Sequence, residues 1–432
     1  MKSIWYNDIE LPKFPALVGN IKTKVLIVGG GIAGLLTAYF LKQKGVEYAL
    51  VERSTICSGT TSRTTAKLTA QHGLIYSKMI RSMGIEKAQM YLAANRKALD
   101  KYTELCKKTD CDYEIKNNFV YSTDDRACLE REMAALDKMG FKASLHDDLP
   151  LPIKTVGGVC FPDQAQFHPL KFLAFISKGL NIYENTFVRH IDSNKAFTDT
   201  GSITAELIVV TTHFPFVNKH GLFFLKLYQH RSYVLALKDA EDVGGMYVDE
   251  SKTGLSFRNH NGLLLLGGGA HRTGKQGGNY DELRLFAFDK YPDSMEVCSW
   301  AAQDCMSLDN MPYIGRYSKS TPRILTASGF NKWGMSGAML SAMLLCDSIC
   351  GVKNEFSSLF DPSRSILKPQ LAVNGAETVK NLLIPFGKRC PHMGCALKWN
   401  KAEHTWDCAC HGSRFSSDGA VLDNPSNKNL KA

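Results

Sequence analysis

The 432-residue sequence has no uninterrupted apolar run that approaches the ~20 residues needed for a membrane-spanning helix. Its first residues lack the apolar core of a secretory signal peptide. We therefore expect a cytoplasmic protein without a transmembrane segment. The 52 lysines and arginines outnumber the 42 acidic residues, but they form no basic stripe, which argues against nucleic acid as a partner. The formal charge of +10 fits either a solvated surface or an acidic substrate or redox partner.

The thirteen cysteines do not form the disulfide framework of a small secreted domain. Nine are scattered along the chain, and we interpret them as reduced, structural residues. The other four fall between Cys390 and Cys410, where a metal site is the better interpretation. The length and a globular composition, 44% hydrophobic and 22% charged, together predict two or three domains.

Two cysteine and histidine pairs near the C-terminus have the spacing of iron–sulfur ligands. Cys390 and His392 form a Cys-x-His pair, and Cys408 and His411 form a Cys-x-x-His pair. Two thiolates and two imidazoles in this order suit a [2Fe–2S] cluster in which one iron has two Cys ligands and the other has two His ligands. A tetrahedral zinc site is the alternative. Zinc sites rarely use Cys-x-His, so the pattern favours the cluster.

The N-terminal region contains a glycine-rich turn between a predicted strand and a predicted helix. Thr23–Val28 is a short apolar run; Gly29, Gly31 and Gly34 follow it, and a helical pattern then runs to Gly45. Gly29 permits a tight turn, Gly31 the approach of a pyrophosphate, and Gly34 the close packing of helix on strand. The start of the helix then faces the phosphates of a dinucleotide.

An acidic residue and a hydroxyl-rich stretch follow this turn. Tyr48–Val51 predicts the next strand, and Glu52 at its end is placed to accept hydrogen bonds from an adenosine ribose. Residues 57–69 are rich in Ser, Thr and Gly, and they suit either a pyrophosphate and ribityl chain or an ordinary polar loop. On these motifs alone, NAD and FAD both remain possible.

Taken with later segments, the sequence resembles the D-amino-acid oxidase/glycine oxidase superfamily of FAD enzymes. Within it, the sequence is similar to the gamma-glutamylputrescine oxidoreductase-like branch, whose members can carry a Rieske domain at the C-terminus. The matching stretches, which cover most of residues 1–365, are Gly29–Gly45, Ser58–Tyr76, Phe161–Pro169, Gln303–Arg316 and Ser328–Met335.

The resemblance implies an α/β fold class. It predicts a Rossmann-like, glutathione-reductase-type FAD-binding domain with an inserted mixed-sheet substrate domain, plus a small all-β Rieske-like domain. The oxidoreductase part spans residues 1–365 and the Rieske-type part residues 366–432. FAD-binding segments are expected at about 20–77, 155–215 and 305–352, and substrate-domain segments at about 78–154 and 216–304. We predict helices over Ser77–Lys108, Asp124–Met139 and Ala338–Cys350, strands over Tyr183–Val188 and Leu207–Val210, and a less periodic connector over Ser365–Lys388.

The resemblance also implies which residues bind FAD. The backbone of Val188 contacts the adenine, and Gly329–Gly337 brings a helix N-terminus to the N1–C2 region of the flavin, where it stabilises the reduced ring. Lys332 adds positive charge there or lies near N5. The expected cofactor-binding residues are Gly29, Gly31, Ile32, Ala33, Gly34, Glu52, Arg53, Thr60, Thr61, Thr65, Val188, Thr211, Gly329, Lys332, Trp333, Gly334 and Met335.

The sequence contains few candidate residues for binding or reacting with the substrate. Arg231, Tyr233 and Arg258 are candidate anchors for a substrate carboxylate, although an ordinary ion pair is the alternative for each arginine. We take Arg258 and Lys332 as the candidate catalytic-site residues. The sequence has no recognisable Ser/His/Asp triad or paired carboxylates. Three isolated histidines are expected to be structural or flavin-contacting rather than general bases: His72, His168 and His213.

In the C-terminal part, resemblance to Rieske domains assigns a role to each cluster residue. Cys395 and Cys410 match the pair that forms a disulfide in many Rieske proteins, a bond that persists in a reducing cytoplasm only when buried and unstrained. Phe415 replaces a frequent tyrosine, and the loss of its hydroxyl should lower the cluster potential. The domain is also shorter than usual. The implied ligands are Cys390 and Cys408 on the inner iron and His392 and His411 on the outer iron.

We therefore predict an FAD-dependent dehydrogenase that acts on the CH–NH or CH–NH2 group of an amine or amino acid. Hydride passes to flavin N5, and the resulting imine is hydrolysed. The electrons then leave singly through the Rieske [2Fe–2S] cluster to an external acceptor, such as a small redox protein or a quinone. The alternative is a flavin/iron–sulfur module that relays electrons between protein partners without a metabolite substrate.

Overall fold

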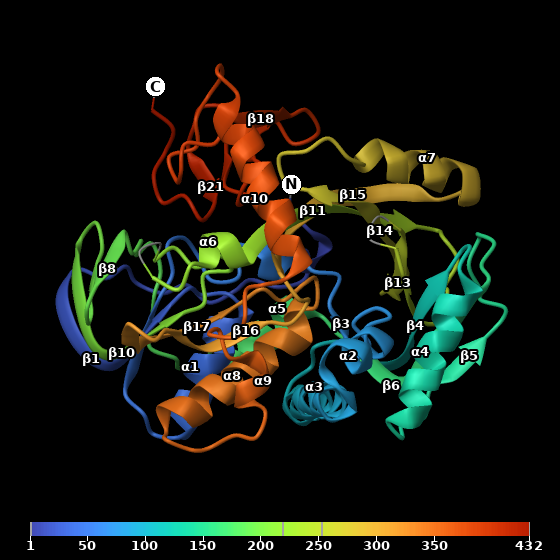
Figure 1. Cartoon of the computed structure of the whole chain (residues 1–432), viewed down its shortest axis with the longest axis horizontal. Helices are drawn as coiled ribbons and strands as arrows, with labels where there is room; N and C mark the ends of the chain where they lie inside the picture. The colour runs from blue at the N-terminus through green and yellow to red at the C-terminus, as the bar shows by residue number, and fades with distance from the viewer. Residues whose placement is uncertain (1, 218–219, 252–253, 432) are drawn as a thin grey trace.

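The computed structural model describes residues 2–217, 220–251 and 254–431. They form two large β-sheets with helices packed around them and a small third sheet near the C-terminus (Figure 1). Within these ranges, no helix has both the length and the apolar composition that a bilayer crossing requires.

An eight-stranded sheet carries the glycine-rich turn. At its centre β1 (Gly19–Val28) pairs in parallel with β2 (Tyr48–Val51) on one side and β10 (Gly201–Val210) on the other. The last four residues of β1 are all buried, as expected for a parallel strand covered on both faces. Its helices α1 (Ile32–Gln43) and α8 (Gly334–Ile349) pack against each other. The remaining strands are β7 (Ile182–Tyr183), β8 (His190–Asp192), β9 (Lys195–Phe197), β16 (Tyr313–Ser318) and β17 (Thr321–Ser328).

A nine-stranded mixed sheet draws on both predicted substrate-domain segments. Its strands are β3 (Lys67–Leu68), β4 (Glu114–Ser122), β5 (Ser144–His146), β6 (Gly157–Gln166), β11 (Leu227–Lys238), β12 (Met246–Asp249), β13 (Ser256–His260), β14 (Leu263–Arg272) and β15 (Met295–Ser307). A parallel pairing of β12 with β4 joins the two segments. Because β6 pairs with β4 here, the assignment of residues 155–215 to the FAD-binding part is wrong as far as Gln166.

Two predicted elements are divided or shortened by residues with positive φ. The helical stretch Ser77–Lys108 is two helices, α2 (Tyr76–Met83) and α3 (Ile85–Cys106), because Gly84 between them has a φ of +87°. The strand predicted over Tyr183–Val188 is wrong beyond Tyr183, since Asn185 turns the chain with a φ of +48°. Other helices are α4 (Arg126–Lys138), α5 (Pro169–Ile176), α6 (Phe223–Lys226), α7 (Tyr280–Lys290) and α9 (Ser357–Phe360), with 3-10 turns η1 (Ile4–Tyr6) and η2 (Thr60–Arg63).

The C-terminal part is a small antiparallel sheet preceded by a helix. Its strands are β18 (Leu397–Asn400), β19 (Thr405–Cys408), β20 (Arg414–Phe415) and β21 (Val421–Asp423). The less periodic connector predicted over Ser365–Lys388 contains a helix that was not predicted, α10 (Pro369–Leu383). The buried residues of α10 are Asn374, Glu377 and Asn381, so its inward face is polar and its apolar residues lie on the exposed face. Figure 1 shows α10 running along one side of the small sheet.

Candidate functional site

The turn between β1 and α1 leaves no room for side chains. Gly29 has a φ of +113°, and a Cβ there would lie 2.8 Å from the carbonyl oxygen of Thr211. A Cβ on Gly34 would lie 2.0 Å from the carbonyl oxygen of Gly29. Thr211 fixes the turn, because its hydroxyl donates to the carbonyl of Val28 at 3.1 Å. The start of α1 borders an open space through Gly31, Ile32 and Ala33, and the N–H of Ile32 donates to the hydroxyl of Thr61 at 3.1 Å. A helix N-terminus in this position suits a phosphate group.

That open space is a cavity of about 940 Å³. Every expected FAD-binding residue lines it except Gly34 and Gly329. A Cβ on Gly34 would meet the backbone of Gly29, and one on Gly329 would meet the side chain of Leu227 at 3.0 Å. Glu52 accepts hydrogen bonds from the N–H groups of Gly30 at 2.7 Å and Ser54 at 3.0 Å, and burial raises the pKa of this carboxyl. The size of the cavity, its glycine floor and the buried carboxylate at the end of β2 fit FAD.

The loop before α8 forms the other end of the cavity. Asn331 and Lys332 both have positive φ, of +52° and +72°, and Asn331 accepts a hydrogen bond from the N–H of Ser307 at 2.8 Å. Trp333 stacks on His72 with ring centroids 4.9 Å apart. Burial lowers the pKa of His72 to about 3, so this histidine is neutral and does not act as a base near pH 7. This end of the cavity is thus lined by the His72–Trp333 pair, by Lys332 and by the N-terminus of α8.

The other two histidines differ in their relation to the cavity. His168 is the N-cap of α5 and accepts a hydrogen bond from the N–H of Lys171 at 3.1 Å, away from the lining. His213 lines the cavity, and burial lowers its pKa.

Asp304 on β15 is a cavity residue that the sequence reasoning missed. Its carboxylate lines the cavity and lies 3.4 Å from the hydroxyl of Ser232 on the neighbouring strand. Burial raises the pKa of Asp304, and the positive charge of Lys332 opposes that effect. The only available signal was alternation along the strand, which does not reveal which face of β15 meets a ligand.

Neither arginine proposed as a substrate anchor reaches the cavity. Arg258 is fully buried and donates to the carbonyls of Thr65 and Ala66, so its assignment to the substrate is wrong. Arg231 is buried against Glu403 of the C-terminal part, with its Nε 2.9 Å from a carboxylate oxygen. Tyr233 borders the cavity, but its hydroxyl lies on the side of the C-terminal part, where it bonds to Asn400 and is 3.1 Å from the Nε2 of His271.

Two loops of the small sheet bring the four expected cluster ligands together. The thiol of Cys408 hydrogen-bonds to the sulfur of Cys390, and with the N–H groups of His392 and Met393 it lowers the pKa of Cys390 to about 7. The rings of His392 and His411 meet edge to face with centroids 5.0 Å apart. Burial lowers the pKa values of these histidines to about 4 and about 3, so both are neutral, as metal ligands must be.

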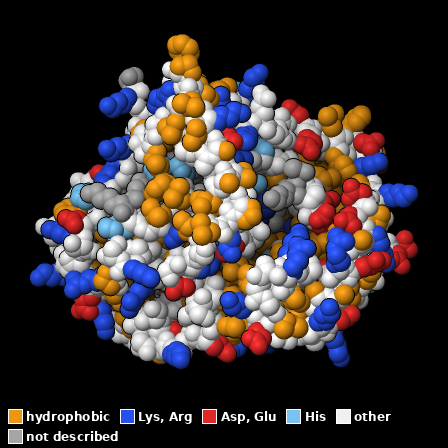
Figure 2. All heavy atoms as spheres, viewed as in Figure 1, with side chains coloured by type: hydrophobic (Ala, Val, Ile, Leu, Met, Phe, Trp, Pro, Cys, Tyr) orange, Lys and Arg blue, Asp and Glu red, His pale blue; other side chains and the backbone are white. Residues whose placement is uncertain are grey.

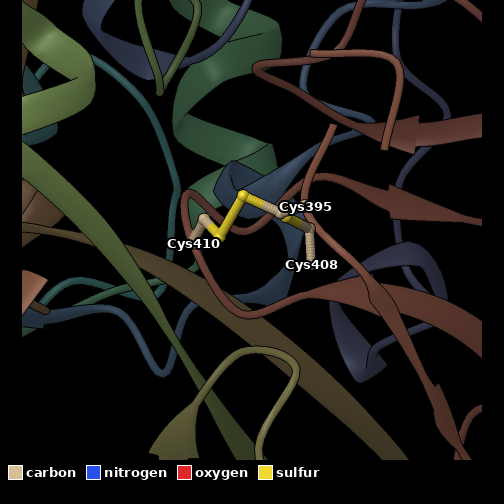
Figure 3. Close-up of side chains that lie close together, drawn as sticks. All are labelled: Cys395, Cys408 and Cys410. Atoms are coloured by element: carbon tan, nitrogen blue, oxygen red, sulfur yellow. A yellow bond between two sulfur atoms is a disulfide. The ribbon is translucent and has the colours of Figure 1, made fainter. Parts of the chain in front are cut away.

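A disulfide joins Cys395 to Cys410, which is the pairing that the resemblance implies (Figure 3). The sulfur atoms of Cys395, Cys408 and Cys410 lie within 4.8 Å of one another. Two of these three sulfurs are consumed by the disulfide, so this group is not the ligand set. The Nδ1 of His411 is buried without a hydrogen-bond partner. A donor set of two thiols and two neutral imidazoles, one with an unused buried nitrogen, fits a Rieske-type cluster.

Strand β11 lies between part of the cavity and the cluster loop. The side chains of His230 and Ser232 line the cavity, whereas those of Gln229 and Arg231 bond to the C-terminal part on the opposite face. Gln303 on the neighbouring β15 also reaches across, donating to the carbonyl of Gly412 at 2.8 Å. The wall between the cavity and the cluster loop is therefore one strand layer thick.

Hydrogen bonds connect the cavity to a cluster ligand through this wall. His213, which lines the cavity, lies with its Nε2 3.0 Å from the Oε1 of Gln229. Gln229 in turn donates through its Nε2 to the backbone carbonyl of His411 at 2.8 Å. Eight residues of the C-terminal part also line the cavity: Arg414, Val421, Leu422, Asp423, Asn424, Ser426, Asn427 and Asn429. No local sequence pattern predicts these contacts, because they join segments about 200 residues apart.

Comparisons with known proteins agree with both parts of the site. Residues 24–348 match the FAD dependent oxidoreductase family (DAO), and residues 363–432 match the Rieske [2Fe-2S] domain. A glycine oxidase from Geobacillus kaustophilus shares the fold, with a TM-score of 0.68 at 20% identity over 80% of this chain and 99% of that one. The cytochrome b6-f complex iron-sulfur subunit 2 of Trichormus variabilis (strain ATCC 29413 / PCC 7937) is 41% identical over 51 residues, 11% of this chain and 29% of the subunit.

One relative has the same overall extent. YhfW of Bacillus subtilis (strain 168), whose name describes a Rieske 2Fe-2S iron-sulfur protein, is 34% identical over an alignment that covers 100% of this chain and 97% of YhfW. The FAD-type cavity and the cysteine–histidine loops described above lie within the two matched regions. The chain therefore belongs to the FAD dependent oxidoreductase family and carries a C-terminal Rieske [2Fe–2S] domain.

Proposed function

We propose that this protein oxidises the C–N bond of an amine or amino acid and sends the electrons through its own Rieske cluster to an external acceptor. The observation that carries the proposal is the single strand layer between the cavity and the cluster loop. When bound, FAD supplies a hydride acceptor and the cluster a one-electron carrier. On this account the domain boundary lies near residue 365, and the two parts work as one unit.

Asp304 is the residue we assign to holding the substrate nitrogen. It is a carboxylate on the cavity wall, near the lysine of the loop that precedes α8. A carboxylate binds an ammonium group strongly where water is excluded. Amines and amino acids both offer that group. Asp304 would hold and orient the substrate, and correct positioning is the main contribution that a protein makes to this reaction.

The contact between the two parts supports transfer within one molecule. Gln229 is buried and holds the backbone of the His411 loop, while Arg272 donates to the carbonyls of Ala409 and Cys410 at 2.8 and 3.0 Å. These bonds fix the cluster loop against the wall of the cavity. A buried contact of this kind holds the cluster loop in a fixed position relative to the cavity.

The test is anaerobic addition of a panel of amines and amino acids to the holoenzyme while the visible flavin band is followed. We expect one class of compound to bleach the flavin and then to produce the paramagnetic signal of a reduced Rieske cluster. Bleaching by a reduced carrier protein and by no amine or amino acid would contradict the proposal and support the relay alternative.

A further inference from the structure

Helix α10 presents apolar side chains to solvent and polar ones to the protein. Its buried face holds Asn374, Glu377 and Asn381. Figure 2 shows hydrophobic side chains gathered over this helix, near the upper centre of the view. We name this surface the α10 patch, and it consists of Val373, Val379, Leu382, Leu383, Phe386 and Met393, all exposed.

The orientation of α10 is held by its polar face. Arg272 donates to the side-chain oxygen of Asn374 at 2.8 Å, and Lys275 pairs with Glu377 at 2.6 Å. A helix fixed in this way cannot turn its apolar residues inward without losing these bonds. A contiguous apolar surface on a soluble domain marks a place where something binds.

The segment that carries the α10 patch has charges of one sign, apart from one buried carboxylate. Between residues 365 and 396 the chain has four cationic side chains, Lys368, Lys380, Lys388 and Arg389. The single carboxylate in that range is Glu377, which is buried and paired with Lys275. A partner for this surface therefore needs an apolar centre and acidic residues around it.

The α10 patch is continuous with the cluster loop. Three residues separate Phe386 from Cys390, and Met393 of the patch follows the expected iron ligand His392. A protein seated on this surface would thus contact the residues that hold the outer iron. A protein bound there would contact the apolar side chains, the cationic side chains and the cluster loop at the same time.

We propose that the α10 patch is the docking surface of an acidic one-electron carrier protein, which oxidises the reduced cluster by one electron at each encounter. This inference rests on the proposed function. A second copy of the chain fits poorly, because a two-fold contact would place the four cations against one another. Binding to a lipid surface would explain the apolar and cationic residues of the patch, but it would not explain why the patch lies beside the cluster.

The experiment reduces the holoenzyme cluster with dithionite and mixes it with an oxidised acidic blue-copper protein in a stopped-flow instrument. The change is Leu383→Ser with Phe386→Ser, side chains that are 75% and 83% exposed. We expect the rate constant for copper reduction to fall about tenfold, the equivalent of ~1.4 kcal/mol in the barrier. Added salt should slow the wild-type reaction. Reduction of ferricyanide, which needs no apolar surface, should change less than twofold.

Helix α7 offers a matched control in Leu285→Ser with Phe288→Ser. These side chains are 71% and 80% exposed but lie outside the α10 patch. We expect this variant to reduce the copper protein at the wild-type rate. Calorimetric titration with the same copper protein reads the docking alone, and the α10 variant should bind about tenfold more weakly.

Equal rates and equal affinities for the two double variants would overturn the proposal. Two other results would also overturn it, if the α10 variant reduced the copper protein at the wild-type rate. One is that the variant no longer floats with phosphatidylglycerol vesicles, and the other is that it loses a dimer that the wild type forms in sedimentation. Because dithionite reduces the cluster directly, these results do not depend on the substrate. Failure of every amine and amino acid to bleach the flavin would count against the proposed function and leave the docking result standing.

Discussion

At the scale of single residues, Asp304 sets the charge that meets the substrate. Burial raises the pKa of this carboxyl above its ordinary value. The ionised form is the one that binds an ammonium group, so turnover should decrease as the pH falls through that raised pKa. Asp304→Asn should remove this acidic limb from the kcat/KM profile and lower kcat/KM by about 10–100-fold, since a hydrogen bond to a charged group contributes about 1.5–3 kcal/mol.

The measurement is the pH dependence of kcat/KM for the best amine, with Ser232→Ala as the control. Ser232 lies 3.4 Å from the same carboxylate but carries no charge. Its variant should keep the acidic limb. If Asp304→Asn retained both the limb and the rate, our assignment of this residue would be wrong.

Lys332 is the second residue whose charge we expect to matter. It lies in the loop before α8 and lines the cavity. Lys332→Met should lower the midpoint potential of the flavin, because a positive charge near the ring favours its reduced, anionic form. An effect of about 1–3 kcal/mol corresponds to about 20–60 mV for two electrons. Potentiometric titration measures it, Lys332→Arg should keep the wild-type potential, and an unchanged potential in Lys332→Met would rule out the charge role.

At the scale of elements, the sequence pattern predicted those helices and strands whose apolar residues are buried. The glycine turn and the strand Tyr48–Val51 are found as expected, because each depends on a short local pattern. Helix α10 was missed because its inward face is polar and is held by residues of a distant strand and loop. Asp304 was missed, and the two arginines were candidate anchors, for a related reason: only the folded sheet shows which face of a strand meets the cavity.

Arg272 on β14 bonds to both the cluster loop and α10. Its guanidinium donates to two carbonyls of the cluster loop and to Asn374 of α10. Arg272→Met should lower the free energy of unfolding of the C-terminal domain by about 2–4 kcal/mol, because buried carbonyls lose their donors. Urea unfolding followed by loss of the cluster absorbance measures this. The exposed pair of Arg284 with Glu296 gives the control, and Arg284→Met should cost at most about 1 kcal/mol.

At the scale of the whole molecule, the ion pair between Arg231 and Glu403 joins the two domains. Burial tends to raise the pKa of Glu403, but the charges of Arg231 and Arg414 outweigh it and hold that pKa below its ordinary value. A depressed folded-state pKa contributes stability above the unfolded value of about 4.3, and this contribution is lost as the pH falls through the folded value. The domain contact should therefore weaken in acid.

Glu403→Gln should weaken the contact at neutral pH as well, by about 3–5 kcal/mol, because it leaves the guanidinium of Arg231 buried without a partner charge. Limited proteolysis between the domains and thermal unfolding at several pH values report this change. The exposed pair of Lys97 with Glu355 supplies the control, and Glu355→Gln should behave as wild type. Equal pH profiles for the two variants would contradict the role of the buried pair.

The two redox parts were each recognisable in the sequence, but their contact was not. The cluster ligands and the glycine turn are short motifs, whereas the wall of β11 and β15 joins residues far apart in the chain. The central claim is that electrons cross this wall within one molecule. The most direct test is an anaerobic single turnover with the best amine, stopped by rapid freezing at several protein concentrations. We predict that the paramagnetic signal of the reduced Rieske cluster grows at a rate independent of protein concentration. A rate that rises in proportion to protein concentration, or flavin reduction without a cluster signal, would contradict the account.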